Sequence, residues 1–362
     1  MAKLGEICLI NPKSCTLRDD TEVSFIPMTK VGEHGEFDAS EIKNYSEVKK
    51  GFTNFQNGDI LFAKITPCME NGKGAIAHNM KNGIGFGSTE FHVLRPDTDK
   101  ITREWLYYLT TWKTFRKEAE RNMTGSAGQK RVPKTFLENY VVNLPDIDTQ
   151  KSENKILRKV DDLISLCKQQ LAKLDELVKA RFVEMFGDPI RNDKHFVQKT
   201  GKSLFCFSSG KFLQEEKRFQ HGFPVYGGNG ITWYTDIPLV KKPTIIIGRV
   251  GAYCGNVRMV NVPVWITDNA IYIKEFKTRE LNLHFLLMLM KYIKFSNYAD
   301  YSGQPKITQK PLETLIYIVP PLELQNRFAA FVERVDQQKQ TVQQSLEKLE
   351  LMKKALMQEY FG

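Results

Sequence analysis

The chain has 362 residues, of which 52 are Lys or Arg and 42 are Asp or Glu, giving a formal net charge of +10 at pH 7. The length is typical of two domains, and the 41% share of hydrophobic residues is that of a globular protein in water. No apolar stretch reaches the roughly 18 residues of a membrane span, and the N-terminal MAKLGEICLINPK lacks the apolar core of a signal peptide, so we expect a cytoplasmic protein without membrane contact.

The positive charge is concentrated in one half of the chain. Residues 1–150 hold 20 basic and 20 acidic side chains, whereas residues 188–325 hold 18 basic and 11 acidic ones. A basic surface favours polyanionic partners, because each neutralised phosphate releases counterions. Charge therefore indicates nucleic acid for the second half, and gives no such signal for the first.

Residues 1–150 are expected to form a first, mostly β, head. Residues 25–28 (FIPM) and 58–65 (GDILFAKI) are short apolar runs of the kind that form strands. One amphipathic helix is predicted over residues 104–120, EWLYYLTTWKTFRKEAE.

Residues 151–187 are expected to form a long helix that ends at Gly187. Its apolar residues follow the 3-4 heptad spacing of a coiled coil, and Ile156, Leu163 and Leu177 are expected to widen this stripe. The predicted seam consists of Leu157, Val160, Ile164, Cys167, Leu171, Leu174 and Val178.

Residues 188–325 are expected to form a second head on the same plan. Strands are predicted over residues 223–226 (FPVY) and 243–250 (PTIIIGRV), with a glycine-rich turn at residues 227–230. Residues 283–293, LHFLLMLMKYI, predict a helix that is almost wholly apolar and therefore buried.

Residues 326–362 are expected to form a second long helix, with Lys339 and Lys353 at two seam positions. A helix with a wide apolar stripe must bury it, so we expect the two long helices of one chain to pair antiparallel. The alternatives are that each helix packs on its own head, or that the coiled coil forms between chains. The predicted seam consists of Val332, Val335, Val342, Leu346, Leu349 and Leu356.

A long internal repeat relates the two halves. Residues 128–150 align without a gap with residues 303–325, at an offset of 175. The same offset continues through both long helices as far as Phe186-Gly187 and Phe361-Gly362. The sequence therefore predicts two copies of one plan, related by a pseudo-twofold axis. The aligned identities include Gly128 with Gly303, Gln129 with Gln304, Leu137 with Leu312, Glu138 with Glu313, Pro145 with Pro320, and Gln150 with Gln325.

The sequence carries no recognisable catalytic or metal site. Gly201-Lys202-Ser203 lacks the upstream glycine of a phosphate-binding loop, because Phe196 stands in its place. Residues 143–146 (NLPD) lack the second proline and the aromatic residue of an amino-methyltransferase motif, and the six histidines are scattered. We expect a binding protein with no catalytic residue, no metal and no cofactor of its own.

The repeat and its motifs resemble a known family. Two divergent heads, each followed by a Leu-Pro or Pro-Pro-Leu segment with a glutamine and then by a long helix, resemble the DNA-specificity (S) subunits of Type I restriction-modification systems, the HsdS family. The resemblance covers essentially the whole chain. It rests on GDILFAKI, FPVYGGNGI, residues 128–131 (GQKR), residues 303–306 (GQPK) and residues 319–325 (VPPLELQ).

The resemblance implies an α+β fold, in which two mixed β-rich target recognition domains are joined by a long antiparallel two-helix coiled coil. It implies that each head reads one half of a bipartite, asymmetric site in double-stranded DNA, and that the helices set the unread spacer. Two methylation subunits would dock on the chain, and two restriction subunits could join them. S-adenosylmethionine, ATP and Mg would bind to those partners, because this chain would be the non-catalytic subunit of an adenine methyltransferase and ATP-dependent endonuclease.

Basic and amide side chains near the predicted loops are the candidates for DNA contact. Lys and Arg grip phosphates, Arg forks onto guanine, and Gln or Asn pairs with adenine. In the first head the candidates are Lys64, Gln129, Lys130, Arg131 and Lys134, and in the second head they are Tyr226, Asn229, Arg249, Gln304 and Lys306.

Two other classes of function stay open at this point. A modification enzyme with a degenerate active site would need a pocket for S-adenosylmethionine. A scaffold with two heads linked by a coiled coil would bind protein only, and would not shift DNA in a gel.

Overall fold

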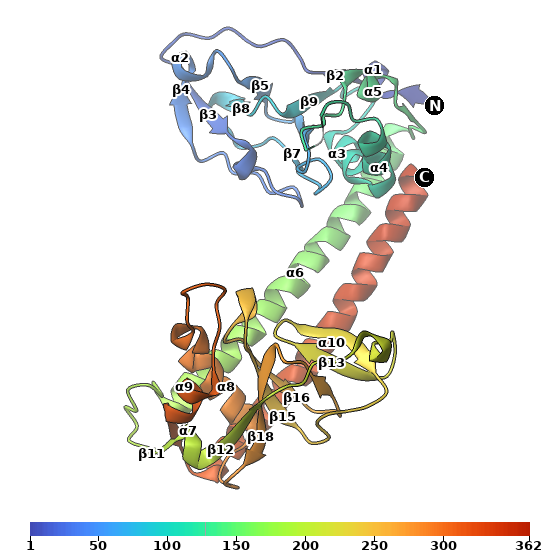
Figure 1. Cartoon of the computed structure of the whole chain (residues 1–362). Coiled ribbons are helices and arrows are strands. Elements are labelled where there is room, and N and C mark those ends of the chain that lie inside the picture. The colour runs from blue at the N-terminus through green and yellow to red at the C-terminus, as the bar shows by residue number, and fades with distance from the viewer. Residues whose placement is uncertain (127) are drawn as a thin grey trace. The chain divides into compact units, whose positions relative to one another are not determined.

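The computed structural model describes residues 1–126 and 128–362, which form two compact units (Figure 1). The first unit contains residues 1–166 and 346–362, and the second contains residues 167–345. Each unit therefore combines one predicted head with a part of each long helix.

The first unit has two four-stranded sheets, with strand orders β2-β9-β6-β7 and β4-β3-β8-β5, and a short β1-β10 pair. Its strands are β1 (Ala2–Lys3), β2 (Cys8–Ile10), β3 (Glu22–Ile26), β4 (Ile42–Asn44), β5 (Thr53–Gln56), β6 (Ile60–Ala63), β7 (Gly74–Ile76), β8 (Ile84–Gly87), β9 (Phe91–Pro96) and β10 (Val141–Val142). Its shorter helices are α1 (Leu4–Ile7), α2 (Tyr45–Val48), α3 (Arg103–Thr111), α4 (Lys113–Arg121) and α5 (Lys134–Asn139).

The second unit has sheets of order β12-β18-β15-β16 and β14-β13-β17, and a β11-β19 pair. Its strands are β11 (Val197–Thr200), β12 (Phe205–Ser209), β13 (Phe223–Gly227), β14 (Gly230–Thr235), β15 (Thr244–Gly248), β16 (Val257–Val260), β17 (Trp265–Ile266), β18 (Ala270–Phe276) and β19 (Ile316–Val319). Its shorter helices are α7 (Gly201–Leu204), α8 (Leu283–Ile293) and α9 (Gln309–Thr314).

The two heads share one topology. In each, a central strand (β6 or β15) lies antiparallel between two neighbours of the same kind. In each, a second sheet contains one parallel pair, β3 with β8 or β13 with β17. The internal repeat predicted from the sequence therefore extends into the divergent front parts, where sequence similarity is weak.

Two 40-residue helices, α6 (Ile147–Phe186) and α10 (Leu322–Phe361), complete the fold. Each begins four residues before its predicted start, directly after Asp146 or Pro321. The Asp146 carboxylate accepts hydrogen bonds from the backbone N–H groups of Asp148 (3.0 Å) and Thr149 (2.9 Å). Asp146 is thus the N-cap of α6.

Within each unit the two long helices lie antiparallel. In the first unit Leu157 of α6 shares a core with Met357 of α10, and in the second Val178 shares one with Val335. Every predicted seam residue is buried or half-buried.

The prediction that three further residues widen the buried stripe was wrong. Ile156, Leu163 and Leu177 are 41%, 39% and 47% exposed, because each lies on the outer side of its helix, away from the seam. A two-helix pair covers only a narrow stripe of each helix, so residues one position outside the seam stay in contact with solvent.

Both seam lysines pair with aspartates of the facing helix. The Lys353 ammonium lies 2.6 Å from the Asp161 carboxylate in the first unit, and the Lys339 ammonium lies 2.5 Å from Asp175 in the second. Moving from Asp161 to Asp175 along α6 is 14 residues forward, and moving from Lys353 to Lys339 along α10 is 14 residues back. The two helices therefore have the same antiparallel register in each unit.

Two local predictions need correction. The single helix over residues 104–120 is broken into α3 and α4 at Trp112, which has an extended backbone. The hydroxyls of Thr110 and Thr111 donate to carbonyls three residues earlier, which competes with helical hydrogen bonding at that point. The first predicted strand ends at Ile26, because Pro27 begins a 3-10 turn.

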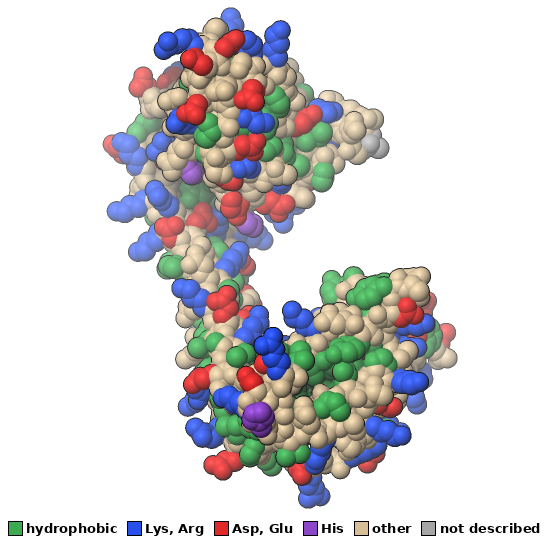
Figure 2. Space-filling view, turned by 90° about the vertical axis from the view of Figure 1, so that its left-hand side faces the viewer, with side chains coloured by type: hydrophobic (Ala, Val, Ile, Leu, Met, Phe, Trp, Pro, Cys, Tyr) green, Lys and Arg blue, Asp and Glu red, His purple; other side chains and the backbone are tan. Residues whose placement is uncertain are grey.

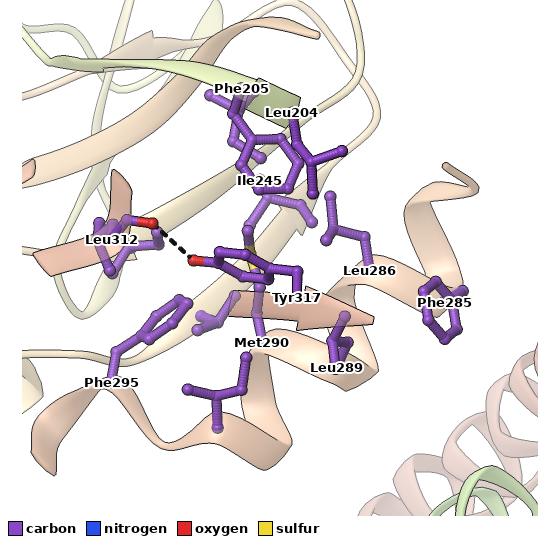
Figure 3. Packing of buried hydrophobic residues seen from close by; sticks show 14 of the residues in the cluster. Leu204, Phe205, Ile245, Phe285, Leu286, Leu289, Met290, Phe295, Leu312 and Tyr317 are labelled. Atoms are coloured by element: carbon purple, nitrogen blue, oxygen red, sulfur yellow. Dashed lines mark hydrogen bonds between the residues drawn. The ribbon is translucent and has the colours of Figure 1, made fainter. Parts of the chain in front are cut away.

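Figure 3 shows the packing of the second head's core. Phe205 of β12, Ile245 of β15, and Leu286 and Met290 of α8 surround the fully buried ring of Tyr317. The Tyr317 hydroxyl donates to the Leu312 carbonyl oxygen at 3.0 Å, so the one polar atom of the ring is satisfied.

Candidate nucleic-acid interface

The candidate residues of the first head gather where the central strand β6 ends. The backbone N–H of Lys64 donates to the Glu90 carbonyl (2.9 Å), and the Lys64 carbonyl accepts from the N–H of Val132 (2.9 Å). Lys64 therefore lies between the residue before β9 and the segment of residues 128–132. We call this place the first junction, made of Lys64, Glu90 and Arg131.

The second head builds the same junction from different side chains. The N–H of Arg249 donates to the Asn269 carbonyl (2.9 Å), and the Arg249 carbonyl accepts from the N–H of Ile307 (2.9 Å). Arg249 thus takes the place of Lys64, and Asn269 takes that of Glu90. The second junction consists of Arg249, Asn269 and Lys306.

Arg131 and Lys306 are equivalent by their backbone pairing. Arg131 bridges Ile65 and Thr124, whereas Lys306 bridges Val250 and Asp300. These bridges place the predicted G-Q-x-K/R segments directly beside the strand ends. The structure therefore brings Lys64 together with Arg131, and Arg249 together with Lys306, as a common cluster in each head.

The remaining candidates of the first head lie around this junction. Gln129 and Lys130 are exposed, and the Lys130 carbonyl accepts from the N–H of Thr66 (3.1 Å). Lys134 begins α5 and pairs with Glu138 at 3.0 Å, which engages part of its charge within its own helix.

His92 lies below the first junction. One ring nitrogen is 2.8 Å from the Val132 carbonyl and the other is 3.0 Å from the Asn11 amide nitrogen. Burial lowers the pKa of His92, and the charges of Lys64 and Lys134 lower it further. The imidazole is therefore neutral, with its proton on the nitrogen that faces Val132.

In the second head, Tyr226 lies near the end of β13, and Asn229 lies in the hairpin turn that follows it. The Tyr226 carbonyl accepts from the N–H of Thr267 (2.9 Å), and the Asn229 carbonyl accepts from the Arg258 guanidinium (2.7 Å). Gln304 is exposed on the segment that leads to Lys306. The structure thus gathers all five second-head candidates around one strand end.

The structure adds basic residues that sequence reasoning missed. A hollow of about 640 Å³ beside the segment of residues 128–131 is lined by Lys117, Arg121 and Lys130, together with Thr66, Glu70, Glu120, Met123 and Gly128. Lys117 and Arg121 are four residues apart on α4, so they share one helix face. That spacing is the signal in the sequence that could have singled them out.

The second head also exposes large apolar side chains. Phe212, Phe219 and Trp233 are 65%, 44% and 45% exposed, and Ile231, on the same strand as Trp233, is 50% exposed. In the view of Figure 2, hydrophobic side chains gather on the second unit, whereas acidic and basic side chains are interspersed over the first. An exposed apolar cluster of this kind is typical of a contact surface.

Within residues 1–126 and 128–362, no group of three His, Cys, Asp or Glu residues is placed to hold a metal ion. No helix in the same part of the chain is both long and apolar enough to cross a bilayer.

Comparison with known proteins identifies the class to which this architecture belongs. Residues 1–176 and 196–351 match the family model described as the Type I restriction modification DNA specificity domain. The chain belongs to this family, and the two matched segments contain the two heads with their junctions.

Named relatives are specificity subunits of Type I restriction enzymes. The chain is 47% identical over 179 residues to the EcoAI specificity subunit and 41% identical over 179 residues to the EcoEI specificity subunit, both from Escherichia coli. These matches cover 48% of this chain but only 30% and 29% of the two relatives. The putative MjaX specificity subunit of Methanocaldococcus jannaschii is 26% identical over 372 residues, covering 92% of this chain and 83% of that protein.

Solved structures show the same fold along the whole chain. The Type I restriction-modification S subunit from M. genitalium superposes with a TM-score of 0.65 at 18% identity, covering 100% of this chain and 95% of that one. A chain from a study of Type I complex assembly gives a TM-score of 0.58 at 18% identity, covering 99% and 96%. These likenesses confirm the predicted fold class.

Proposed function

We propose that this chain reads a bipartite, asymmetric site in double-stranded DNA, with each head binding one half-site. The observation that carries the proposal is the pair of equivalent junctions. They have the same backbone hydrogen bonds but different side chains, Lys64, Glu90 and Arg131 in one head and Arg249, Asn269 and Lys306 in the other. The same backbone arrangement carries different polar side chains in the two heads, as expected if each head binds a different base sequence.

We propose that the helix pair sets the unread spacer between the half-sites. A 40-residue helix is about 60 Å long at 1.5 Å per residue. The ion pairs at Asp161 and Asp175 fix the register of the two helices, and a fixed register favours a narrow range of half-site spacings.

Two methylation subunits would dock on the chain at equivalent places. Leu177 of α6 and Met352 of α10 are 175 residues apart, so they are repeat equivalents, and each is 47% exposed. Identical partners require equivalent contacts, and exposed apolar residues at repeat-related positions meet that requirement. Two restriction subunits would complete an endonuclease.

The chemistry would belong to those partners. In this proposal the chain is a non-catalytic subunit, and S-adenosylmethionine, ATP and Mg bind to the methylation and restriction subunits. The chain contributes selection of the site and placement of the partners on it.

The test is to co-express this chain with its methylation subunit in a host that lacks adenine methylation, and to map modified adenines across the genome. A split motif, with two specified blocks around an unspecified gap, is the expected result. A complex that assembles but methylates nothing would point to a scaffold, and an uninterrupted motif would contradict the two-headed reader.

A further inference from the structure

The two junctions carry a charged side chain in one head and a neutral one in the other at an equivalent position. Glu90 directly precedes β9 in the first head, and Asn269 directly precedes β18 in the second. Each offers its backbone carbonyl to the basic residue after the central strand. The first head thus carries a carboxylate where the second carries a neutral amide.

In the first head this carboxylate holds Arg131. Its oxygens lie 2.7 Å from Arg131 Nη2 and 2.9 Å from Arg131 Nε, a bidentate pair. Arg131 Nη1 also donates to the Gln129 carbonyl at 3.0 Å. Hydrogen bonding to the guanidinium lowers the pKa of Glu90, so the carboxylate stays ionised at neutral pH.

These contacts fix the guanidinium without covering it. Three of the five N–H groups of an arginine are used, so two remain, and the Arg131 side chain is still 42% exposed. A planar, oriented guanidinium with two free N–H groups suits a base edge that offers two acceptors, such as guanine. Its neutralised charge makes it a poor anchor for phosphate.

Lys306, the equivalent of Arg131 in the second head, is not held by a carboxylate of the described residues. Lys306 is exposed and, within the described part of the chain, forms no ion pair within 4.0 Å. Asp300, which bridges it by backbone, acts on it only at longer range. An exposed ammonium with no carboxylate beside it among the described residues, close to Arg249, is suited to phosphate.

We propose that Glu90 is a specificity-determining residue of the first head. Glu90 holds the Arg131 guanidinium as a fixed hydrogen-bond donor to one base pair, and so keeps it from binding a DNA phosphate. In the second head, the neutral Asn269 leaves Lys306 available to bind a DNA phosphate. The two heads therefore divide recognition unequally at the same structural position. This inference rests on the proposed DNA-reading function.

The experiment uses the assembled complex with methylation subunits and compares the wild type with Glu90→Gln. Binding is measured on random duplex DNA at several salt concentrations, and on a set of targets in which each base pair of both half-sites is replaced in turn. With Glu90→Gln, discrimination at one base pair is expected to fall on the order of tenfold. The salt slope on random DNA is expected to steepen by about 0.9, because Arg131 becomes free for one more phosphate.

The reciprocal variant Asn269→Glu tests the same idea in the other head, and stands even if Glu90→Gln unfolds. It should make the slope shallower by about 0.9 while base discrimination in the half-site affected by Glu90→Gln stays unchanged. A merely structural role of Glu90 would not steepen the salt dependence. In the double variant Glu90→Gln/Arg131→Gln the steepening should disappear.

Three results would overturn the inference: an unchanged slope in either single variant, unchanged discrimination in Glu90→Gln, or steepening that persists in the double variant. Failure of the proposed function would look different, because the wild-type complex itself would then show no preference for any split site.

Discussion

At the residue scale, the buried side chain of Arg116 stabilises a loop of the first head. Arg116 of α4 is buried and donates to the carbonyls of Met69 (2.6 Å) and Lys73 (3.4 Å), while its guanidinium lies 5.0 Å from the centre of the Phe62 ring. Burial lowers the pKa of Arg116 to about 10, so it remains charged at neutral pH without a carboxylate partner. Its energetic role is therefore to satisfy loop carbonyls.

Replacing Arg116 by Met should destabilise the first head. The Met69 carbonyl would lose its charged donor, at a cost of about 1–3 kcal/mol. Hydrogen exchange of the β6 and β9 amides would report this as faster opening, and the second head would be unaffected. Arg121→Met, on the exposed side of the same helix, is the matched control. Equal protection in both variants would refute the role of Arg116.

His92 predicts a dependence of stability on pH. Its pKa is lowered in the folded state, so the unfolded chain binds a proton more readily, and the contribution of this residue to stability falls as pH drops through the ordinary histidine pKa near 6.5. A proton on the nitrogen that faces the Asn11 amide would oppose the contact seen at 3.0 Å.

The check is the first head's stability between about pH 7.5 and 5.5 in the wild type and in His92→Gln, because the introduced amide does not titrate in that range. The variant is expected to show a weaker loss towards acid, whatever its stability at pH 7.5. Parallel pH profiles would mean that His92 does not titrate against folding.

At the element scale, a buried glutamine joins each long helix to its head. In the first unit Gln150 accepts from the N–H of Thr102 (2.8 Å) and donates to the Pro145 carbonyl (2.9 Å). In the second unit Gln325 accepts from the N–H of Asn282 (2.9 Å) and donates to the Pro320 carbonyl (2.7 Å). Thr102 and Asn282 are the N-caps of α3 and α8, so each glutamine connects two helix starts.

We expect Gln325→Ala to loosen this connection. It would leave the half-buried N–H of Asn282 and the buried carbonyl of Pro320 without this partner, at about 1–3 kcal/mol for the buried carbonyl. The measurement is amide exchange in the first turns of α8 and α10, with the exposed Gln337→Ala as control. Exchange that matches the control would show that water replaces the glutamine.

At the scale of the whole molecule, the register of the two long helices offers a test of their proposed role in setting the spacer. In the second unit, the peptide bond between Lys173 and Leu174 lies opposite the one between Gln340 and Thr341, in the register set by Lys339 and Asp175. Inserting seven residues at both of these bonds keeps the apolar seam of the two helices in phase.

Under the proposed function, this double insertion should lengthen the preferred spacer by about 3 base pairs, since seven helical residues add about 10 Å. Genome-wide methylation mapping would reveal the new gap with the same two specified blocks. Insertion in α6 alone breaks the register and should abolish methylation. An unaltered spacer in the double insertion would show that the helices do not set it.

The sequence by itself determined the repeat, the coiled-coil phase and the central strands. These depend on short-range periodicity and on an ungapped alignment, which one chain displays fully. Tertiary structure alone decided that Ile156 and Leu163 lie outside the seam, since only the facing helix fixes which positions are covered. It alone revealed that Glu90 holds Arg131, because 41 residues separate them and a long-range side-chain contact between loops has no periodic signature.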